Sequence, residues 1–91
     1  MIEENDVPRL LRGVRRHQDR VRDCAVLLAP ERVFVLDPVS DAVLAEVDGA
    51  RSFGAIVDAL ASRYNAPRDR IAADAGKFLT SLRDRCLIET T

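Results

Sequence analysis

The residue types that most often carry chemistry are few in this chain of 91 residues. Cys24 and Cys86 lie 62 positions apart and form no CxxC pair, and the single histidine, His17, has no second histidine or cysteine within four positions. A Cys24–His17 pair is conceivable for nucleophilic catalysis, but nothing in the spacing singles it out. The glycines match neither the Walker pattern nor GxGxxG. The sequence therefore predicts no enzyme, no metal site and no cofactor.

The charge of the chain is nearly balanced but unevenly placed. The formal net charge is −1, which gives no global attraction to nucleic acid or to an anionic membrane. Six of the thirteen arginines nevertheless fall between residues 9 and 22. This basic segment either attracts an acidic partner or forms a solvated strand face.

The N-terminal sequence and the hydropathy pattern indicate in which cellular compartment the protein is expected. "MIEENDVPR" is acidic where a signal peptide is basic, and no apolar run is long enough to span a bilayer. We therefore expect a cytoplasmic protein with free thiols and no membrane contact.

The first part of the chain carries β-strand signals. Residues 1–8 are expected to be a flexible leader, and residues 14–21 an outer, arginine-rich strand. Two runs rich in Val, Leu and Phe, residues 25–28 and 33–36, flank a turn at residues 29–32 and predict a β-hairpin.

From residue 38 the apolar spacing becomes helical. Asp37 followed by Pro38 is typical of a helix start, and this first helix is expected to end at Asp48-Gly49. A second helix is predicted over residues 53–64 after Ser52, and a third over residues 68–85. Residues 86–88 add a turn or a short strand. We therefore expect one α+β domain over residues 1–91, winged helix-turn-helix-like, with three N-terminal antiparallel strands followed by three helices.

The predicted hairpin has a second apolar face and an open edge, and something must pack against them. Both of its strands are apolar at every position, so each is apolar on both faces, and residues 33–36 lack the charge or proline that usually protects a sheet edge. Such an edge accepts an extended peptide as an additional strand. The alternative is that the N-terminal segment or a second protomer covers it. A DNA-binding winged helix is a further alternative, although Asp69 and Asp74 on the third helix repel phosphate.

The order and spacing of several pieces resemble the PqqD family of pyrroloquinoline quinone biosynthesis, over about residues 8–88. These pieces are Val14-Arg15, Val21-Arg22, Leu27-Leu28-x-Pro30-Glu31, Leu36, Val43-Leu44, Asp48-Gly49, Ile56 through Tyr64, and Asp74 with Phe78-Leu79-x-x-Leu82.

The resemblance implies a non-catalytic peptide chaperone, a RiPP recognition element. Such a protein binds the ribosomal precursor peptide (PqqA) by strand addition and presents it to a radical-SAM cross-linking enzyme (PqqE). Carried onto this chain, the peptide-binding residues are Val33, Phe34, Val35 and Leu36 on the edge, with Asp74, Ala75, Phe78 and Leu79 on the facing helix. Arg15, Arg16, Arg20 and Arg22 then steer an acidic peptide or dock the enzyme.

Two departures from the family accompany the resemblance. Cys86 stands where the family usually has glycine, and Ala75 where it tends to have a β-branched residue. Recognition elements also serve other ribosomal peptides, so the cargo is less specific than the binding mode. A structural subunit that dimerises through the same edge stays a further alternative.

Overall fold

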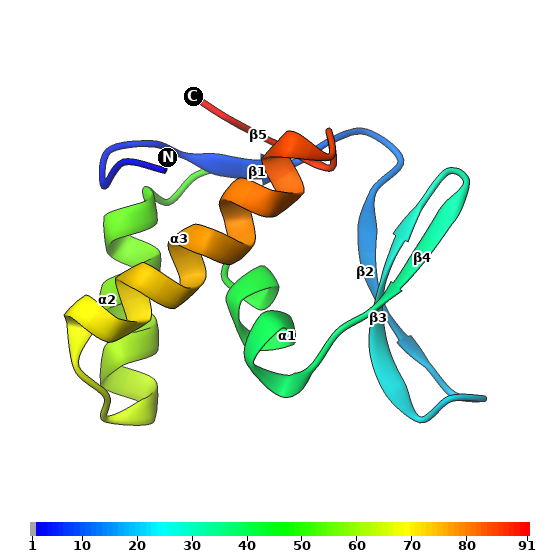
Figure 1. Cartoon of the computed structure of the whole chain (residues 1–91), viewed down its shortest axis with the longest axis horizontal. Coiled ribbons are helices and arrows are strands. Elements are labelled where there is room, and N and C mark those ends of the chain that lie inside the picture. Colours follow the sequence, from blue (N-terminus) through cyan, green and yellow to red (C-terminus); the bar gives the residue numbers. More distant parts are fainter. Residues whose placement is uncertain (1) are drawn as a thin grey trace.

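The strands and helices follow the predicted order, with one unpredicted short strand near the N-terminus and, near the C-terminus, a strand where either a turn or a short strand was expected. The computed structural model describes residues 2–91 (Figure 1). The elements in chain order are β1 (Pro8–Leu10), β2 (Arg15–Asp19), β3 (Cys24–Ala29), β4 (Arg32–Val35), α1 (Pro38–Ala45), α2 (Phe53–Tyr64), α3 (Arg68–Asp84) and β5 (Ile88–Thr90). The predicted α+β architecture, in which a β-hairpin stands beside three helices, is confirmed.

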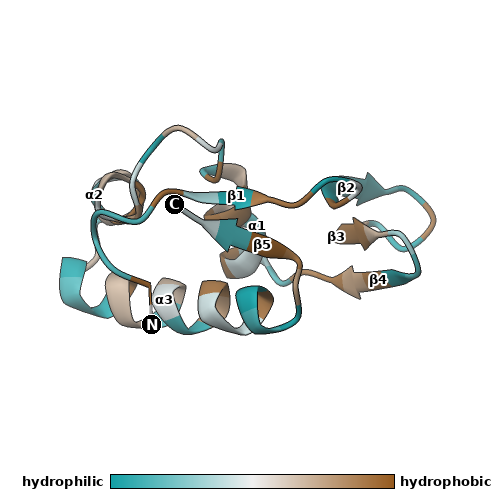
Figure 2. Cartoon of the chain, turned by 90° about the horizontal axis from the view of Figure 1, so that it is seen from above, coloured by the Kyte–Doolittle hydropathy of each residue, from teal (hydrophilic) through white to brown (hydrophobic). Residues whose placement is uncertain are grey.

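The strands form two separate antiparallel sheets. β2, β3 and β4 make a three-stranded sheet in which Leu27 lies opposite both Arg16 and Phe34. β1 and β5 pair in a separate two-stranded sheet, in which Arg9 faces Glu89. In the view from above, β4 is the strand of the larger sheet nearest to the side on which α3 runs (Figure 2).

Local signals set the starts of the first two helices as predicted. Asp37 caps α1 by accepting a 2.7 Å hydrogen bond from the Ser40 amide, and Pro38 occupies the first turn. Ser52 caps α2 in the same way, through a 3.2 Å bond from the Ala55 amide. α1 ends at Ala45, before the predicted Asp48-Gly49 stop, and Gly49 takes a positive φ of 76° in the turn beyond it.

The core lies between the helices and one face of the larger sheet. Figure 1 shows all three helices on the same side of that sheet. Leu27 from β3, Ile56 from α2 and Leu79 from α3 are fully buried where these elements meet. The second face of the β3–β4 hairpin is turned away from this core.

The N-terminal segment differs from the expected flexible leader. Ile2 is buried in the core, and the carbonyls of Glu4 and Asp6 accept hydrogen bonds from the amides that begin α2, at Gly54 and Phe53. Arg68 pairs with Glu4 and holds the segment to the start of α3. These contacts link residues more than 40 positions apart, which local sequence patterns do not encode.

Candidate functional site

The outer edge of β4 carries backbone groups that the sheet does not use. The Leu36 amide donates a 2.9 Å hydrogen bond to the Ala25 carbonyl of β3. Bonded and non-bonded pairs alternate along an antiparallel ladder, so the pair Leu27–Phe34 is bonded and the pair Val26–Val35 is not. The N–H and C=O groups of Val35, and by the same alternation those of Val33, therefore point away from β3.

The four predicted edge residues divide between two environments. Val33 and Val35 are 51 % and 63 % exposed on the face turned away from the helices. Phe34 packs against the core and lies beneath the Arg85 guanidinium, 5.7 Å from its ring centre. Leu36 follows the end of β4, is buried in the core, and uses its N–H within the sheet. Leu36, which the resemblance assigned to the peptide-binding edge, is thus a core residue in the structure.

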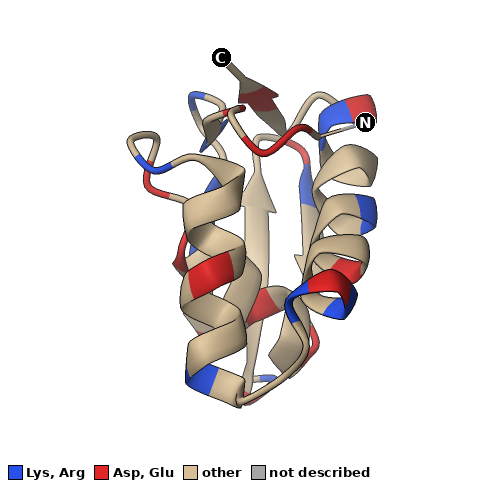
Figure 3. Cartoon of the chain, turned by 90° about the vertical axis from the view of Figure 1, so that its left-hand side faces the viewer, with Lys and Arg blue, Asp and Glu red and all other residues tan. Residues whose placement is uncertain are grey.

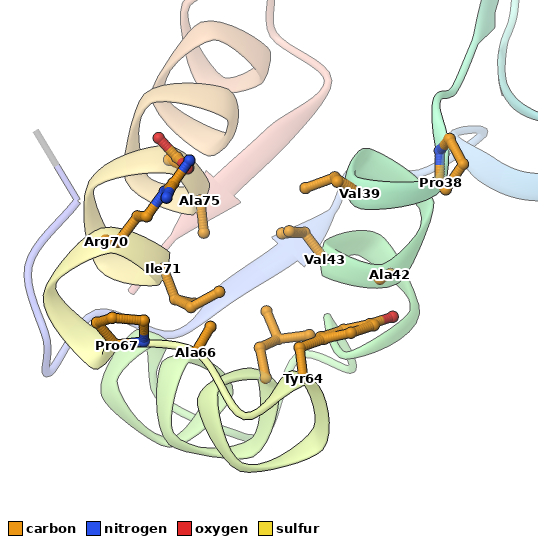
Figure 4. Close-up of a pocket in the computed structure, with 12 residues that line it drawn as sticks. Pro38, Val39, Ala42, Val43, Tyr64, Ala66, Pro67, Arg70, Ile71 and Ala75 are labelled. Atoms are coloured by element: carbon orange, nitrogen blue, oxygen red, sulfur yellow. The ribbon is translucent and has the colours of Figure 1, made fainter.

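An apolar cavity of about 390 Å³ opens among the three helices, beyond the end of β4 (Figure 4). Val39, in the first turn of α1, leads from the β4 edge to this cavity and is 66 % exposed. The lining residues come from α1, from the end of α2 with its following turn, and from the first half of α3: Pro38, Val39, Ala42, Val43, Leu60, Tyr64, Ala66, Pro67, Arg70, Ile71, Asp74 and Ala75. We call this space the helical cavity.

The predicted residues of α3 are only partly brought together by the helical cavity. Asp74 and Ala75 line it, as predicted for the facing wall. Phe78 lies one turn further along and packs against the core, and Leu79 is fully buried beneath. Ala75 and Leu79 share the buried face of α3, so the division follows from position along the helix: the cavity reaches only the first half of α3, and the core covers the next turn.

Val39, Tyr64 and Ile71 line the helical cavity but were not predicted as site residues. Their helical spacing places them on the apolar stripes of α1, α2 and α3, which predicts core positions. In the structure Val39 and Tyr64 are exposed and Ile71 is half-buried, all at the mouth of the helical cavity. The apolar face of a helix can extend beyond the neighbouring helices that pack on it. The sequence of the helix alone does not show which of its apolar residues are left exposed.

The polar groups of the helical cavity stand at its rim. Arg70 and Asp74, one turn apart on α3, are both exposed, and Tyr64 adds a hydroxyl from α2 (Figure 4). Asp37, between β4 and α1, has its pKa lowered because its carboxylate accepts the Ser40 amide hydrogen bond. The edge and the cavity therefore combine directed backbone donors, an apolar depression and a few polar contacts, which is the composition of a binding site.

The four arginines predicted to dock a partner point in different directions. Arg16 turns toward the helices, where its guanidinium bonds the Asp41 carboxylate of α1 at 3.1 Å. Arg15, its neighbour on β2, therefore points to the opposite face. Arg20 and Arg22 lie in the turn after β2, where Arg22 is 3.8 Å from Asp19.

The remaining candidates for chemistry stay dispersed. Within residues 2–91, no three His, Cys, Asp or Glu side chains converge as metal ligands. His17 is exposed on β2, and the two free thiols, Cys24 and Cys86, lie on β3 and after α3. No helix in this part of the chain is both long and apolar enough to cross a bilayer.

Comparison with known proteins gives consistent matches. Residues 24–88 match the family model of coenzyme PQQ synthesis protein D (PqqD). A PqqA binding protein of Rhizobium meliloti (strain 1021) is 38 % identical over 89 residues, which cover 98 % of this chain and 91 % of that protein.

Two solved structures share the fold. One is the solution structure of the PqqD truncation of Methylobacterium extorquens PqqCD, a functional and stand-alone RiPP recognition element, with a TM-score of 0.84 and 43 % identity, covering 98 % of this chain and 95 % of that one. The other is TbiB1 in complex with the TbiA(beta) leader peptide, with a TM-score of 0.75 and 25 % identity, covering 89 % of this chain and 94 % of that one. From the family match and the nearly full-length similarity to these relatives, we conclude that the chain belongs to the PqqD family.

Proposed function

We propose that this protein is a non-catalytic peptide chaperone for pyrroloquinoline quinone biosynthesis. It binds the ribosomal precursor peptide (PqqA) as an additional strand on β4 and presents it to the radical-SAM cross-linking enzyme (PqqE). The observation that carries the proposal is the free edge of β4, where the N–H and C=O groups of Val33 and Val35 point away from β3 and toward a prospective strand.

The position of the helical cavity supports the same binding mode. A strand added to the edge lies about 4.8 Å from β4 and parallel to its axis. Because β4 leads through Asp37 into Val39, such a strand extends toward the cavity mouth. An apolar side chain of the peptide then enters between Val43 and Ile71, while the backbone bonds supply affinity that does not depend on sequence.

A chaperone of this kind needs no catalytic residue. Holding the peptide next to its enzyme raises the local substrate concentration, and for short linkers the effective concentration reaches about the millimolar range. The dispersed cysteines, histidine and carboxylates fit such a role, since binding requires none of them as nucleophile or base.

The test is an amide NMR titration of the labelled protein with synthetic PqqA. Strand addition predicts the largest shifts at Val33 and Val35 and at the mouth of the helical cavity, around Val39, Ile71 and Asp74. A scrambled PqqA of identical composition is the control. The absence of shifts at a large excess of PqqA removes the proposal, and shifts confined to β1 and β5 remove the strand-addition mode.

A recognition element for a different ribosomal peptide is the second candidate. The similarity to TbiB1, whose structure contains a leader peptide, favours this class of cargo in general. Titration with an unrelated leader peptide separates the two candidates. If the protein is specific for PqqA, PqqA displaces the unrelated leader peptide from the site. If the second candidate is right, the leader peptide displaces PqqA.

A further inference from the structure

The face of β2–β3–β4 turned away from the helices, which we call the outer face, is an apolar surface outside the core. Paired residues share a face of a sheet, so Leu28 lies with Val33, and Val26 lies with Val35. Val33 and Val35 are the exposed members of this face, Leu28 is half-buried, and Val26 is buried at 1 % exposure. All three helices lie on the other side of the sheet (Figure 1). The outer face is the second apolar face that the hairpin sequence predicted.

Basic side chains border this apolar surface on the β2 side. Arg15 and His17 are exposed beside Leu28 and Val26, as their register on β2 requires. Arg20 lies in the turn at one end of β2. Among residues 2–91, no carboxylate lies within 4.0 Å of the Arg15 or Arg20 guanidinium. On the helices, by contrast, acidic and basic residues are interspersed (Figure 3).

The charge of this border selects the kind of partner. An apolar centre with unpaired cations at its rim is complementary to an apolar surface with carboxylates at its rim. A second copy of this chain does not meet that requirement, because its outer face brings the same unpaired cations. The occupant must therefore be a different protein with an acidic rim.

The outer face is also continuous with the proposed peptide site. Val33 and Val35 contribute their side chains to the outer face and their backbone groups to the free edge. A peptide strand on that edge extends the sheet, and every second side chain of the peptide then stands on the outer face. A protein docked on the outer face thus meets the protein and the bound peptide on one surface.

We propose that the outer face is the docking surface for the peptide-modifying enzyme, through an apolar region of that enzyme bordered by carboxylates. The proposal rests on the proposed function, and it assigns a surface to the second partner. It selects Arg15 and Arg20 and excludes Arg16, whose guanidinium is bound to Asp41 on the helix side.

The test measures the affinity of the radical-SAM enzyme for the protein, with and without PqqA, by biolayer interferometry. Arg15→Glu combined with Arg20→Glu reverses two exposed charges on the rim and is expected to weaken enzyme binding about tenfold or more, because attraction to the partner's carboxylates becomes repulsion at both positions. Lys77→Glu, an exposed charge reversal on α3, is the control and is expected to change binding less than about twofold.

Two outcomes overturn the docking surface. One is unchanged enzyme affinity in the Arg15/Arg20 double variant with an unaltered circular dichroism spectrum. The other is a monomer-to-dimer transition of the wild type that the double variant abolishes, because it makes a second copy the occupant. Failure of the proposed function is distinguishable, since it appears as loss of PqqA binding by the wild type in the separate NMR titration.

Discussion

Val26 and Val35 lie opposite each other on neighbouring strands and on the same face of the sheet, yet their exposure differs from 1 % to 63 %. Val26 is flanked on both sides, by β2 and by β4, whereas Val35 has a neighbouring strand on only one side. A strand added beside β4 gives Val35 the second neighbour that Val26 already has. The difference in exposure between the two valines thus measures how incomplete the sheet is at this edge.

Replacing Val35 by proline tests the edge directly. The Val35 amide points away from β3, so Val35→Pro removes no bond within the sheet but takes one donor from the added strand and introduces the proline ring at the edge. We expect the protein to stay folded and its PqqA affinity to fall about tenfold or more, measured by fluorescence anisotropy.

Two further variants complete the comparison at the edge. Val35→Thr keeps the amide and a β-branched shape, and is expected to bind within a few-fold of the wild type. Phe34→Pro removes an amide that faces β3, and is expected to lower the melting temperature. Normal PqqA affinity in a folded Val35→Pro protein would place the peptide elsewhere.

The helical cavity is tested at Val39, which is exposed in the first turn of α1. Val39→Asp places a charge at the cavity mouth, while an acidic residue in the first turn is compatible with the helix dipole. We expect unchanged folding and about a tenfold loss of PqqA affinity, by isothermal titration calorimetry. Val21→Asp, at a valine of the β2–β3 turn that is even more exposed than Val39 (96 % against 66 %), is the control and is expected to leave affinity intact. Equal effects of the two changes would count against the cavity.

The packed N-terminal segment predicts a stability effect. Ile2 is 6 % exposed, so Ile2→Ala is expected to lower the free energy of unfolding by about 2 kcal/mol, measured by urea denaturation. Glu3→Ala changes an exposed neighbour and is expected to have little effect. A flexible leader predicts no difference between the two variants.

Cys86 occupies a backbone conformation that favours glycine. Its φ is 60°, in the turn between α3 and β5, and a non-glycine residue there costs about 1–2 kcal/mol. Because glycine gains about 0.5–1 kcal/mol of freedom in the unfolded chain, we expect Cys86→Gly to stabilise the protein by about 1 kcal/mol. Cys86→Ala keeps the backbone cost and removes only the thiol, so a gain in that variant as large as in the glycine variant would contradict the explanation.

Sequence patterns predicted the elements whose signals are local. Two apolar runs on either side of the Pro30 turn predicted the β3–β4 hairpin. The capping residues Asp37 and Ser52 predicted the starts of α1 and α2. β1 was missed and β5 was left as either a turn or a strand. Each has only three residues, and they pair across nearly 80 positions of sequence, for which no local pattern exists.

The part of the candidate site that depends on local sequence patterns, the edge strand, was predictable from the sequence. The period of two residues already separates Arg15 from Arg16 and Val35 from Phe34, once the strands are placed. Whether Val39 and Ile71 are covered depends on where α1 and α3 cross, which is a property of the packed helices. The sequence therefore indicated the edge strand, and the structure added the cavity.

The pairing of β1 with β5 has a consequence for how this domain is used. Val7 and Thr91 exchange two backbone hydrogen bonds, of 3.0 and 3.1 Å, so the two ends of the fold lie side by side and away from the β2–β3–β4 sheet (Figure 1). A fold with adjoining ends tolerates circular permutation and insertion into a loop of a host protein. The domain can therefore be joined to a larger polypeptide at one point of attachment while β4 keeps its free edge.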